Sequence, residues 1–298
     1  DVAMAFSQNL SSPPDRKTLQ TFSHFSYQIS LGELIILNLE YNKDTKKIDS
    51  YDIFYLKENG YKNIEDVCVG DKVLTHKNRY EKVAKVMQRK SNDYYILKVF
   101  GYPELKITGE HPMYVLRNGE IEWVKVKDIK TTDKVCFNIN TKNTPSKYDD
   151  SVLWLLGRYV ADGYINKYTY NSVNFSIAFQ KEEYFLSHIP KQMVEKFKKF
   201  KKSVWDYRIA DSELKSLCEE CGMGSVNKRV PQWIQDLPTE KALIFLDGYF
   251  SGDGHKRIHG NQEQMMFSTV SKELFLGIQN LVMKCYGVVC SCSLRIDN

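Results

Sequence analysis

The spacing of apolar and polar residues indicates β-structure in the first half of the chain. Short alternating runs occur at Asp71–Thr75, Lys82–Val86 and Tyr94–Val99, separated by Gly and Asn. Alternation with a period of two is typical of strands that bury one face. We therefore predict an all-β domain over residues 51–140. It contains a tight hairpin turn at Arg117–Glu120, because the two central residues there are Asn and Gly.

Beyond a polar linker at residues 141–150, the pattern predicts helices and strands in mixed order. The predicted elements are a helix over Val152–Val160, strands over Tyr164–Phe179, an amphipathic helix over Glu182–Lys201, a strand over Ser203–Ile209, a short helix over Asp211–Cys221, a helix over Ala242–Phe250, strands over Lys256–Thr269, a helix over Ser271–Tyr286 with Ser271 as its cap, and a strand over Gly287–Leu294. The order helix, strands, helix thus occurs twice. This indicates two structural repeats within residues 151–298, in a chain of the α+β class.

Each repeat opens with nearly the same nine residues. Residues 155–163 read L-L-G-R-Y-V-A-D-G, and residues 246–254 read L-D-G-Y-F-S-G-D-G. Small residues inside both phrases let two helices pack closer than the usual separation of roughly 8–10 Å. The closing Asp-Gly predicts a helix end at which Gly takes the left-handed conformation. If the two helices lie side by side, Asp162 and Asp253 emerge together at one end.

Two neighbouring carboxylates repel each other unless a cation lies between them. The ion that suits two aspartates is a hard divalent one, Mg²⁺ or Mn²⁺, which binds through oxygen atoms and water. Such an ion can activate water and stabilise the leaving oxygen in phosphodiester hydrolysis. A single Asp-Gly is more simply interpreted as a helix stop with a solvated acid. Two copies in matching context favour a metal site at Asp162 and Asp253.

The paired phrases resemble those of the LAGLIDADG (dodecapeptide) homing endonucleases in their single-chain, two-repeat form. The resemblance covers residues 151–298 and includes Asn227–Trp233, N-K-R-V-P-Q-W, and Phe267–Lys272, F-S-T-V-S-K. It implies an αββαββα-type fold, whose second repeat is truncated in this chain, and a Mg²⁺ site at the two acids. It also implies that Lys228 assists the attacking water or the charged phosphate. The alternative for Lys228 is an exposed loop lysine.

The same resemblance implies two β-sheets that lie over the major groove of double-stranded DNA, where alternating side chains contact base edges. The candidate DNA-contacting residues are Asn166, Lys167, Tyr168, Asn174, Ser176 and Gln180 on the first sheet, and His255, Lys256, Arg257, His259 and Gln262 on the second. Each of them also fits a solvated strand residue.

A second resemblance lies in the β-rich half. Residues 60–75, G-Y-K-N-I-E-D-V-C-V-G-D-K-V-L-T, and residues 106–112, K-I-T-G-E-H-P, resemble the N-terminal part of an intein splicing domain of the Hint fold. The resemblance implies that Thr108 donates a hydrogen bond and that His111 polarises or protonates the scissile amide to a host extein in cis. A turn histidine is the alternative for His111. The only candidate for the attacking nucleophile upstream is Ser50.

Composition sets limits on these interpretations. The 298 residues are 42% hydrophobic and 27% charged, enough for about two globular domains. A formal net charge of +5 permits a polyanionic partner. No apolar run reaches the roughly 20 residues that span a bilayer, so no membrane partner is expected. Seven cysteines, an odd number, fit a reduced intracellular protein, and Cys218 and Cys221 are interpreted as buried thiols in preference to zinc ligands.

The ends of the chain complete the hypothesis. Residues 1–50 show no motif with a chemical role, and a host-protein remnant is one interpretation of them. An intein ends in His-Asn, whereas Asn298 is not preceded by His. We therefore expect a fragment of a longer intein that acts as a monomer. The main hypothesis is a Mg²⁺-dependent homing endonuclease attached to a splicing domain. The alternatives are a self-processing element with an inactive endonuclease, and a protein that only binds nucleic acid.

Overall fold

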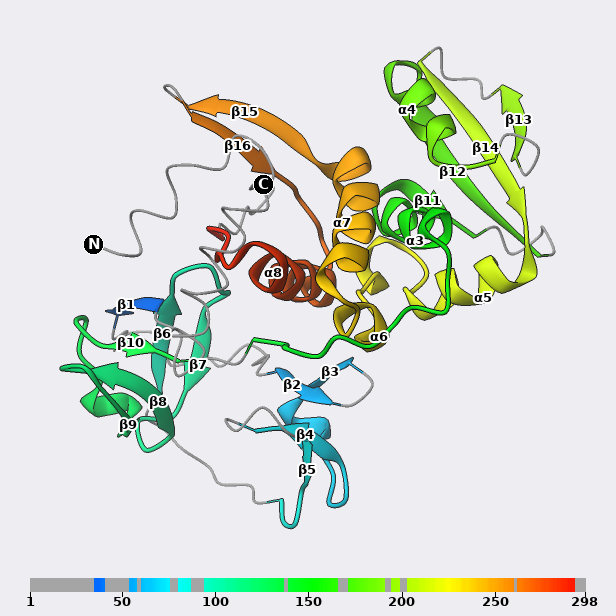
Figure 1. The fold of residues 1–298 in the computed structure, drawn as a ribbon. Helices are drawn as coiled ribbons and strands as arrows, with labels where there is room; N and C mark the ends of the chain where they lie inside the picture. Colours follow the sequence, from blue (N-terminus) through cyan, green and yellow to red (C-terminus); the bar gives the residue numbers. More distant parts are fainter. Residues whose placement is uncertain are drawn as a thin grey trace. The chain divides into compact units, whose positions relative to one another are not determined.

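The computed structural model describes residues 35–40, 54–57, 60–75, 80–86, 94–136, 139–165, 171–190, 194–198, 203–259 and 262–292. The chain divides into two compact units (Figure 1). The β unit contains residues 15–140 and 289–298, and the repeat unit contains residues 1–14 and 141–288. The architecture is mixed α and β with small sheets, which is compatible with the α+β class.

The described part of the β unit consists of strands, 3-10 turns and loops. Its strands are β1 Ile35–Glu40, β2 Phe54–Lys57, β3 Gly60–Asn63, β4 Lys72–Leu74, β5 Tyr80–Lys82, β6 Tyr95–Val99, β7 Leu105–Ile107, β8 Pro112–Arg117, β9 Glu120–Lys125 and β10 Lys134–Val135. They form an antiparallel six-stranded sheet in the order β7-β6-β1-β10-β8-β9 and an antiparallel four-stranded sheet in the order β3-β2-β4-β5. The strand predicted over Lys82–Val86 is wrong, because β5 ends at Lys82.

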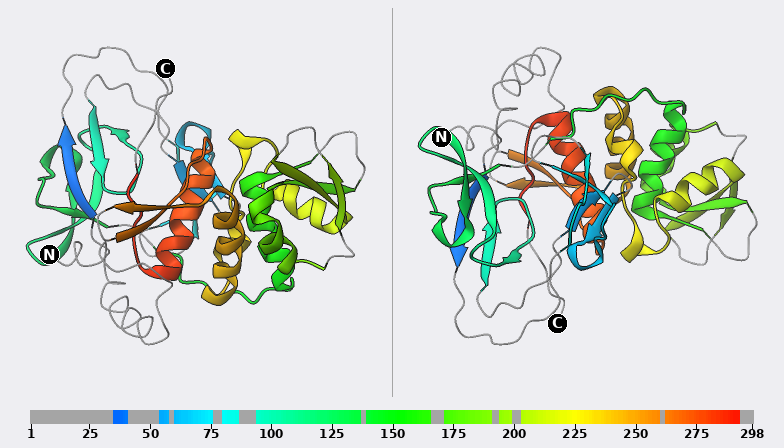
Figure 2. Two further views of the ribbon diagram at one scale, coloured as in Figure 1. Left: turned by 90° about the horizontal axis from the view of Figure 1, so that it is seen from above. Right: turned by 90° about the horizontal axis from the view of Figure 1, so that it is seen from below.

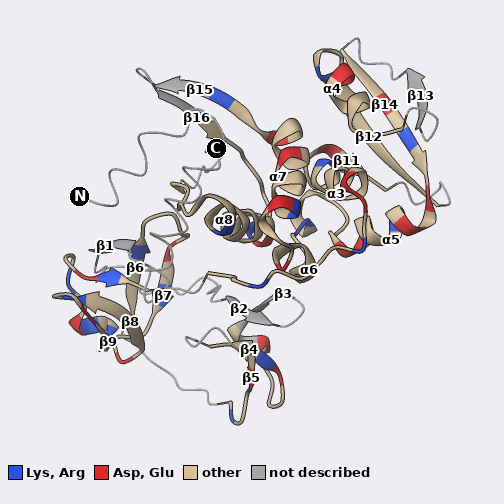
Figure 3. Cartoon of the chain, in the orientation of Figure 1, with Lys and Arg blue, Asp and Glu red and all other residues tan. Residues whose placement is uncertain are grey.

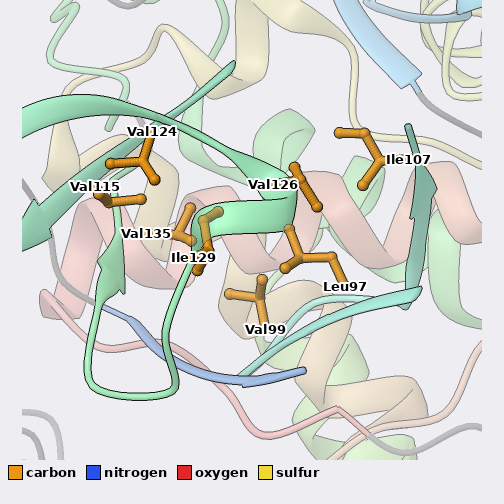
Figure 4. Close-up of a cluster of buried hydrophobic side chains, with 8 residues drawn as sticks. All are labelled: Leu97, Val99, Ile107, Val115, Val124, Val126, Ile129 and Val135. Carbon is orange, nitrogen blue, oxygen red and sulfur yellow. The ribbon is translucent and has the colours of Figure 1, made fainter. Parts of the chain in front are cut away.

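Apolar side chains of the six-stranded sheet form one core. Figure 4 shows its members, which are Leu97, Val99, Ile107, Val115, Val124, Val126, Ile129 and Val135. They come from β6, β7, β8, β9, β10 and the segment after β9, so residues far apart in the sequence bury one another's apolar surface.

The hairpin between β8 and β9 has the predicted tight turn. Arg117 pairs with Glu120 across the two strands, and Asn118 and Gly119 have φ angles of 53° and 89°. Positive φ at both central residues is the type I′ geometry, which Asn-Gly favours. The turn predicted at Arg117–Glu120 is therefore confirmed.

The repeat unit alternates helices with antiparallel strands. Its elements are α3 Asp150–Asp162, β11 Gly163–Tyr164, β12 Ser172–Ala178, α4 Glu182–Ser187, β13 Val194–Lys198, β14 Val204–Ala210, α5 Ser212–Glu220, α6 Gln232–Gln235, α7 Thr239–Asp253, β15 His255–His259, β16 Gln262–Met266 and α8 Lys272–Tyr286. The first sheet has the order β11-β12-β14-β13, and β15 and β16 form a hairpin. Two strands and then a helix therefore follow both α3 and α7.

The two phrases lie on α3 and α7, which touch backbone to backbone. A Cβ atom on Gly157 would overlap the carbonyl oxygen of Phe245, and a Cβ atom on Gly248 would overlap that of Trp154. Each glycine thus lies against the main chain of the opposite helix, where any larger residue would force the helices apart. Figure 2 shows the two helices side by side in both of its views.

Contacts along their length show that α3 and α7 run parallel. Near the helix starts, Lys241 of α7 forms an ion pair with Asp150 of α3. Near the helix ends, Gly252 of α7 lies against Ala161 of α3. The two C-terminal ends therefore lie at the same end of the helix pair.

Two further predicted elements differ from the structure. The helix predicted over Glu182–Lys201 is wrong, because α4 ends at Ser187 and Val194–Lys198 is a strand paired with β14. Pro190 within this segment explains the early end, since proline disrupts a helix interior. In the strand predicted over Gly287–Leu294, the described residues 287–292 are not a strand, and Gly287 instead ends α8 with a φ of 66°.

Among the described residues, no helix has both the length and the apolar character that crossing a membrane requires.

Substitution of Gly248 tests the helix contact. Gly248→Val should lower the free energy of unfolding by about 3 kcal/mol, because the new side chain overlaps the Trp154 backbone and overpacking is destabilising. Urea denaturation followed by circular dichroism measures this change. Ser151→Ala, in the first turn of α3, is the control and should change the stability by less than about 0.5 kcal/mol. A Gly248→Val protein as stable as the wild type would contradict the close approach.

Candidate functional site

The parallel packing of α3 and α7 brings Asp162 and Asp253 to one end of the helix pair. The glycines that follow them are not left-handed, as we had expected, because Gly163 has a φ of −77° and Gly254 a φ of −71°. Glycine is needed there for space instead. A Cβ atom on either residue would overlap atoms of the preceding helical turn, which is Tyr159 for Gly163 and Phe250 for Gly254.

The two carboxylates interact electrostatically. Asp253 is half-buried, and its pKa is raised to about 6, first by burial and then by the negative charge of Asp162. Burial and a like charge both disfavour the ionised form, so the raised pKa agrees with two acids at the same end of the parallel helices.

Lys228 lies beneath the C-terminal end of α3. Its side chain is 6% exposed, and its Nζ donates hydrogen bonds to the carbonyl oxygens of Tyr159 at 2.5 Å and Gly163 at 2.8 Å. Nζ also lies 4.8 Å from the centre of the Tyr159 ring. Burial lowers the pKa of Lys228 to about 8, although Asp253 and Asp162 both act to raise it. Lys228 is therefore not an exposed loop lysine.

The segment before Lys228 is folded tightly enough to fix its position. Gly222 has a φ of +87°, and a Cβ atom there would overlap the carbonyl oxygen of Asn227. The carbonyl oxygen of Lys228 accepts a hydrogen bond from Ser271 Oγ at 2.5 Å. The same Oγ accepts one from the Leu274 backbone N–H at 3.1 Å, so the predicted cap of α8 is confirmed and also holds Lys228.

Two further cations, which sequence reasoning missed, lie at the same end. Arg158 Nη2 donates to Asp162 Oδ2 at 2.6 Å, and Lys181 Nζ donates to the carbonyl oxygen of Gly252 at 2.7 Å. Both cations interact electrostatically with both acids, as Lys228 does. A charged residue inside the apolar run of α3 was a usable signal for Arg158. Lys181, which follows a strand, gave no such signal.

The donor set of this end fits a divalent ion with many water ligands. Two carboxylates converge there, and no group of three or more His, Cys, Asp or Glu ligands occurs among the described residues. Mg²⁺ commonly binds through one or two carboxylates and keeps several waters, so two acids suffice. The remaining ligands would be water molecules or phosphate oxygen atoms.

The expected DNA-contacting residues lie in different environments. Gln180, His255 and Lys256 are exposed, and Lys and Arg occur on β14 and β15 (Figure 3). Asn174 is only 3% exposed, because it lies inside the first sheet, and its assignment as a base-contacting residue is corrected. Ser176 is half-buried and donates to Asp206 at 2.7 Å. Six candidates are described by their backbone alone or lie outside the described residues, and these are Arg257, His259 and Gln262 on β15 and β16, and Asn166, Lys167 and Tyr168.

The cysteine pair of α5 fits the interpretation as buried thiols. Cys218 and Cys221 are fully buried. Burial raises the pKa of Cys221 to about 12 and raises that of Cys218 as well. Thiols with raised pKa values stay protonated at neutral pH in the metal-free protein.

The candidate splicing residues lie in the β unit. The His111 backbone N–H donates to the Thr108 carbonyl oxygen at 3.0 Å, so the two residues close one turn before β8. Thr108 is exposed, whereas His111 is half-buried and burial lowers its pKa. Ser50 lies outside the described residues.

Comparison with known families identifies one of the two repeats. Residues 240–289 match the LAGLIDADG-like domain. This segment runs from α7 to α8 and contains Asp253, so the match supports a region of the homing-endonuclease type in the repeat unit. Residues 4–54 match the alpha-kinase family. Most of that segment lies outside the described residues, and it contains no part of the paired-acid site.

Three relatives show how the similarity is distributed. An uncharacterized protein of Methanocaldococcus jannaschii is 33% identical over 129 residues, which cover 33% of this chain and 16% of that protein. The replication factor C small subunit of the same organism is 27% identical over 201 residues, 64% of this chain and 10% of that protein. The DNA polymerase of Thermococcus kodakarensis is 30% identical over 144 residues, 47% of this chain and 8% of that protein. The chain thus spans a sixth or less of these curated relatives.

The raised pKa of Asp253 predicts a pH-dependent stability. The pKa of Asp253 in the folded protein, about 6, exceeds its ordinary value of 3.8. The contribution of Asp253 to the free energy of unfolding is therefore complete below the ordinary pKa and is lost as the pH rises through about 6. Between about pH 4 and pH 7 in EDTA, the free energy of unfolding of the wild type should fall by roughly 2 kcal/mol, after allowance for the partial exposure of Asp253. The free energy of unfolding of Asp253→Asn should not show this fall.

Urea denaturation at both pH values measures the difference. Asp150→Asn, at the exposed start of α3, is the control and should follow the wild type. If Asp253→Asn had the same pH dependence as the wild type, Asp253 would not lie in a dehydrated site.

Proposed function

We propose that the repeat unit is a site-specific endonuclease that hydrolyses phosphodiester bonds of double-stranded DNA with Mg²⁺ or Mn²⁺. The observation that carries the proposal is the convergence of Asp162 and Asp253 at one end of two parallel helices, beside three buried or half-buried cations. Carboxylates for a divalent ion and cations for a phosphate are the groups that phosphodiester hydrolysis requires.

Each charged residue of the site has its own proposed role in the reaction. A divalent ion held by Asp162 and Asp253 would supply an activated water and charge stabilisation. Lys228 has a pKa of about 8, so at neutral pH it is mostly charged, and its minor neutral fraction can accept a proton. Lys181 is fixed by the Gly252 carbonyl oxygen and adds a positive charge beside the phosphate.

The strands next to the acids support duplex DNA as the substrate. β11 begins directly after Asp162, and β15 begins at His255, two residues after Asp253. DNA that contacts the exposed His255 and Lys256 therefore passes close to the acids. Two repeats around one site also match the two strands of a duplex, because each acid can serve one strand.

The relatives support an element carried by different host proteins. Two of them are named as a replication factor C small subunit and a DNA polymerase, and the matched segment is only 10% and 8% of each. Similar segments within unlike proteins are typical of an inserted element. The finer proposal is therefore an intein that carries the endonuclease.

A second function, protein splicing, is proposed for the β unit because of the turn between Thr108 and His111. Burial lowers the pKa of His111, so the imidazole is neutral at physiological pH and can exchange a proton with a neighbouring amide. The host extein would be the partner in cis, with Ser50 as the proposed nucleophile.

Loss of one acid should separate cleavage from binding. A randomised duplex library, incubated with the chain and Mg²⁺, identifies the site through sequencing of the cleaved ends. On that site, Asp253→Asn should slow cleavage by about 10³-fold, because the ion loses a ligand and charge stabilisation is lost. Its affinity in a gel-shift assay should change by less than about threefold.

Asp247→Asn is the matched control, because Asp247 lies on the same helix away from the acid end. It should cleave as the wild type does. An Asp253→Asn protein that cleaves at the wild-type rate would exclude the proposed metal role. Sequence-specific binding without cleavage by the wild type would favour the alternative of a protein that only binds nucleic acid.

Substitution of His111 tests splicing. In a precursor that carries this chain between flanking sequences, His111→Ala should slow scission of the N-terminal amide by about 10²-fold or more, because a proton donor is lost. Gel electrophoresis of the products measures the rate. Glu120→Gln, in the exposed hairpin turn, is the control. Unchanged scission would leave His111 as a turn histidine.

A further inference from the structure

Arg158 and Tyr249 occupy equivalent positions in the two phrases. Each lies one helical turn before the acid of its own helix, and each is fully buried. Among the described residues, the Nε and Nη1 atoms of Arg158 and the Oη atom of Tyr249 have no hydrogen-bond partner. The two repeats therefore place different chemistry beneath their acids, a cation under Asp162 and a neutral phenol under Asp253.

The guanidinium of Arg158 lies between the two helix ends. Its Nη2 binds Asp162 Oδ2 at 2.6 Å, with 2% of the Arg158 side chain exposed. On the other side, a Cβ atom on Gly252 would overlap Nη1, so the guanidinium fills the space beside the residue that precedes Asp253. Arg158 thus spans from one acid to the neighbourhood of the other.

This position makes the two acids unequal. Asp162 already gives one carboxylate oxygen to a buried cation, and that bond is charge-assisted. The end as a whole has two acids and three cations, Arg158, Lys181 and Lys228. Without DNA there is no net negative charge to attract a divalent ion.

We propose that Arg158 is a positioning residue that competes with the divalent ion for Asp162 and so keeps the affinity of the DNA-free protein for that ion low. The inference rests on the proposed function, because it takes Asp162 and Asp253 as the metal ligands. The guanidinium and the ion both require the oxygen lone pairs of Asp162, and the ion must displace a buried, hydrogen-bonded partner. A phosphate at the same end supplies the negative charge that the cations lack, so DNA and the ion assist each other's binding.

The competition can be measured without DNA and without cleavage. Electron paramagnetic resonance of free Mn²⁺ gives the affinity of the protein for this ion. Arg158→Met should bind Mn²⁺ about tenfold more tightly than the wild type, or more, because Asp162 is released. Lys241→Met is the matched control, since it removes one positive charge at the far end of the same helix pair. It should stay within about twofold of the wild type.

A second measurement uses the wild-type protein, in case Arg158→Met does not fold. The ¹H–¹⁵N signal of Arg158 Nε–H is assigned through its loss in Arg158→Lys. Titration with Mg²⁺ should shift this signal, because the ion takes Asp162 from the guanidinium. An unchanged signal at saturating Mg²⁺, or an Arg158→Met protein that binds Mn²⁺ no more tightly than the wild type, would overturn the inference.

Asp253→Asn separates this inference from the proposed function. If Asp253→Asn abolishes Mn²⁺ binding while Arg158→Met leaves it unchanged, only the role of Arg158 fails. If Asp253→Asn binds Mn²⁺ as the wild type does, the acids are not ligands and the proposed function fails with it.

Discussion

The contact between Gly157 and Gly248 determines how the rest of the repeat unit is arranged. Because each glycine lies against the backbone of the opposite helix, α3 and α7 can approach closely in only one register. That register brings Asp162 and Asp253 to the same end, and the strands that begin after them start from there. A separation set by larger side chains would remove both the shared space and the interaction of the acids.

Burial affects the pKa values of the charged groups at this end more strongly than their pairing does. Desolvation raises the pKa of Asp253 and lowers that of Lys228, so both groups titrate close to neutral pH. Groups that titrate there can donate or accept protons at physiological pH. The structure thus stores unfavourable electrostatic energy at the place where a divalent ion and a phosphate would relieve it.

Local signals in the sequence predicted much of the fold. The apolar spacing of α3 and α7, the capping Ser271 and the Asn-Gly hairpin turn are each encoded within a few residues. The strand Val194–Lys198 was missed because its residues also fit the amphipathic pattern of a helix, and its pairing with the next strand, β14, makes it a strand. At the site, the two acids and Lys228 followed from motifs. Arg158 pairs with Asp162 one turn along the same helix, so its spacing was a local signal that sequence reasoning overlooked. The contact of Lys181 with Gly252 depends on tertiary packing, which sequence reasoning did not reach.

The position of Lys228 couples the two repeats in a way that their sequence symmetry conceals. Lys228 precedes the second phrase in the chain, yet its Nζ donates hydrogen bonds to carbonyl oxygens at the end of the first helix. Its own carbonyl oxygen accepts a hydrogen bond from Ser271. The hydrogen bonds of this one lysine therefore join the end of α3 to the start of α8, so a shift of either helix would displace the cation that lies beside the two acids.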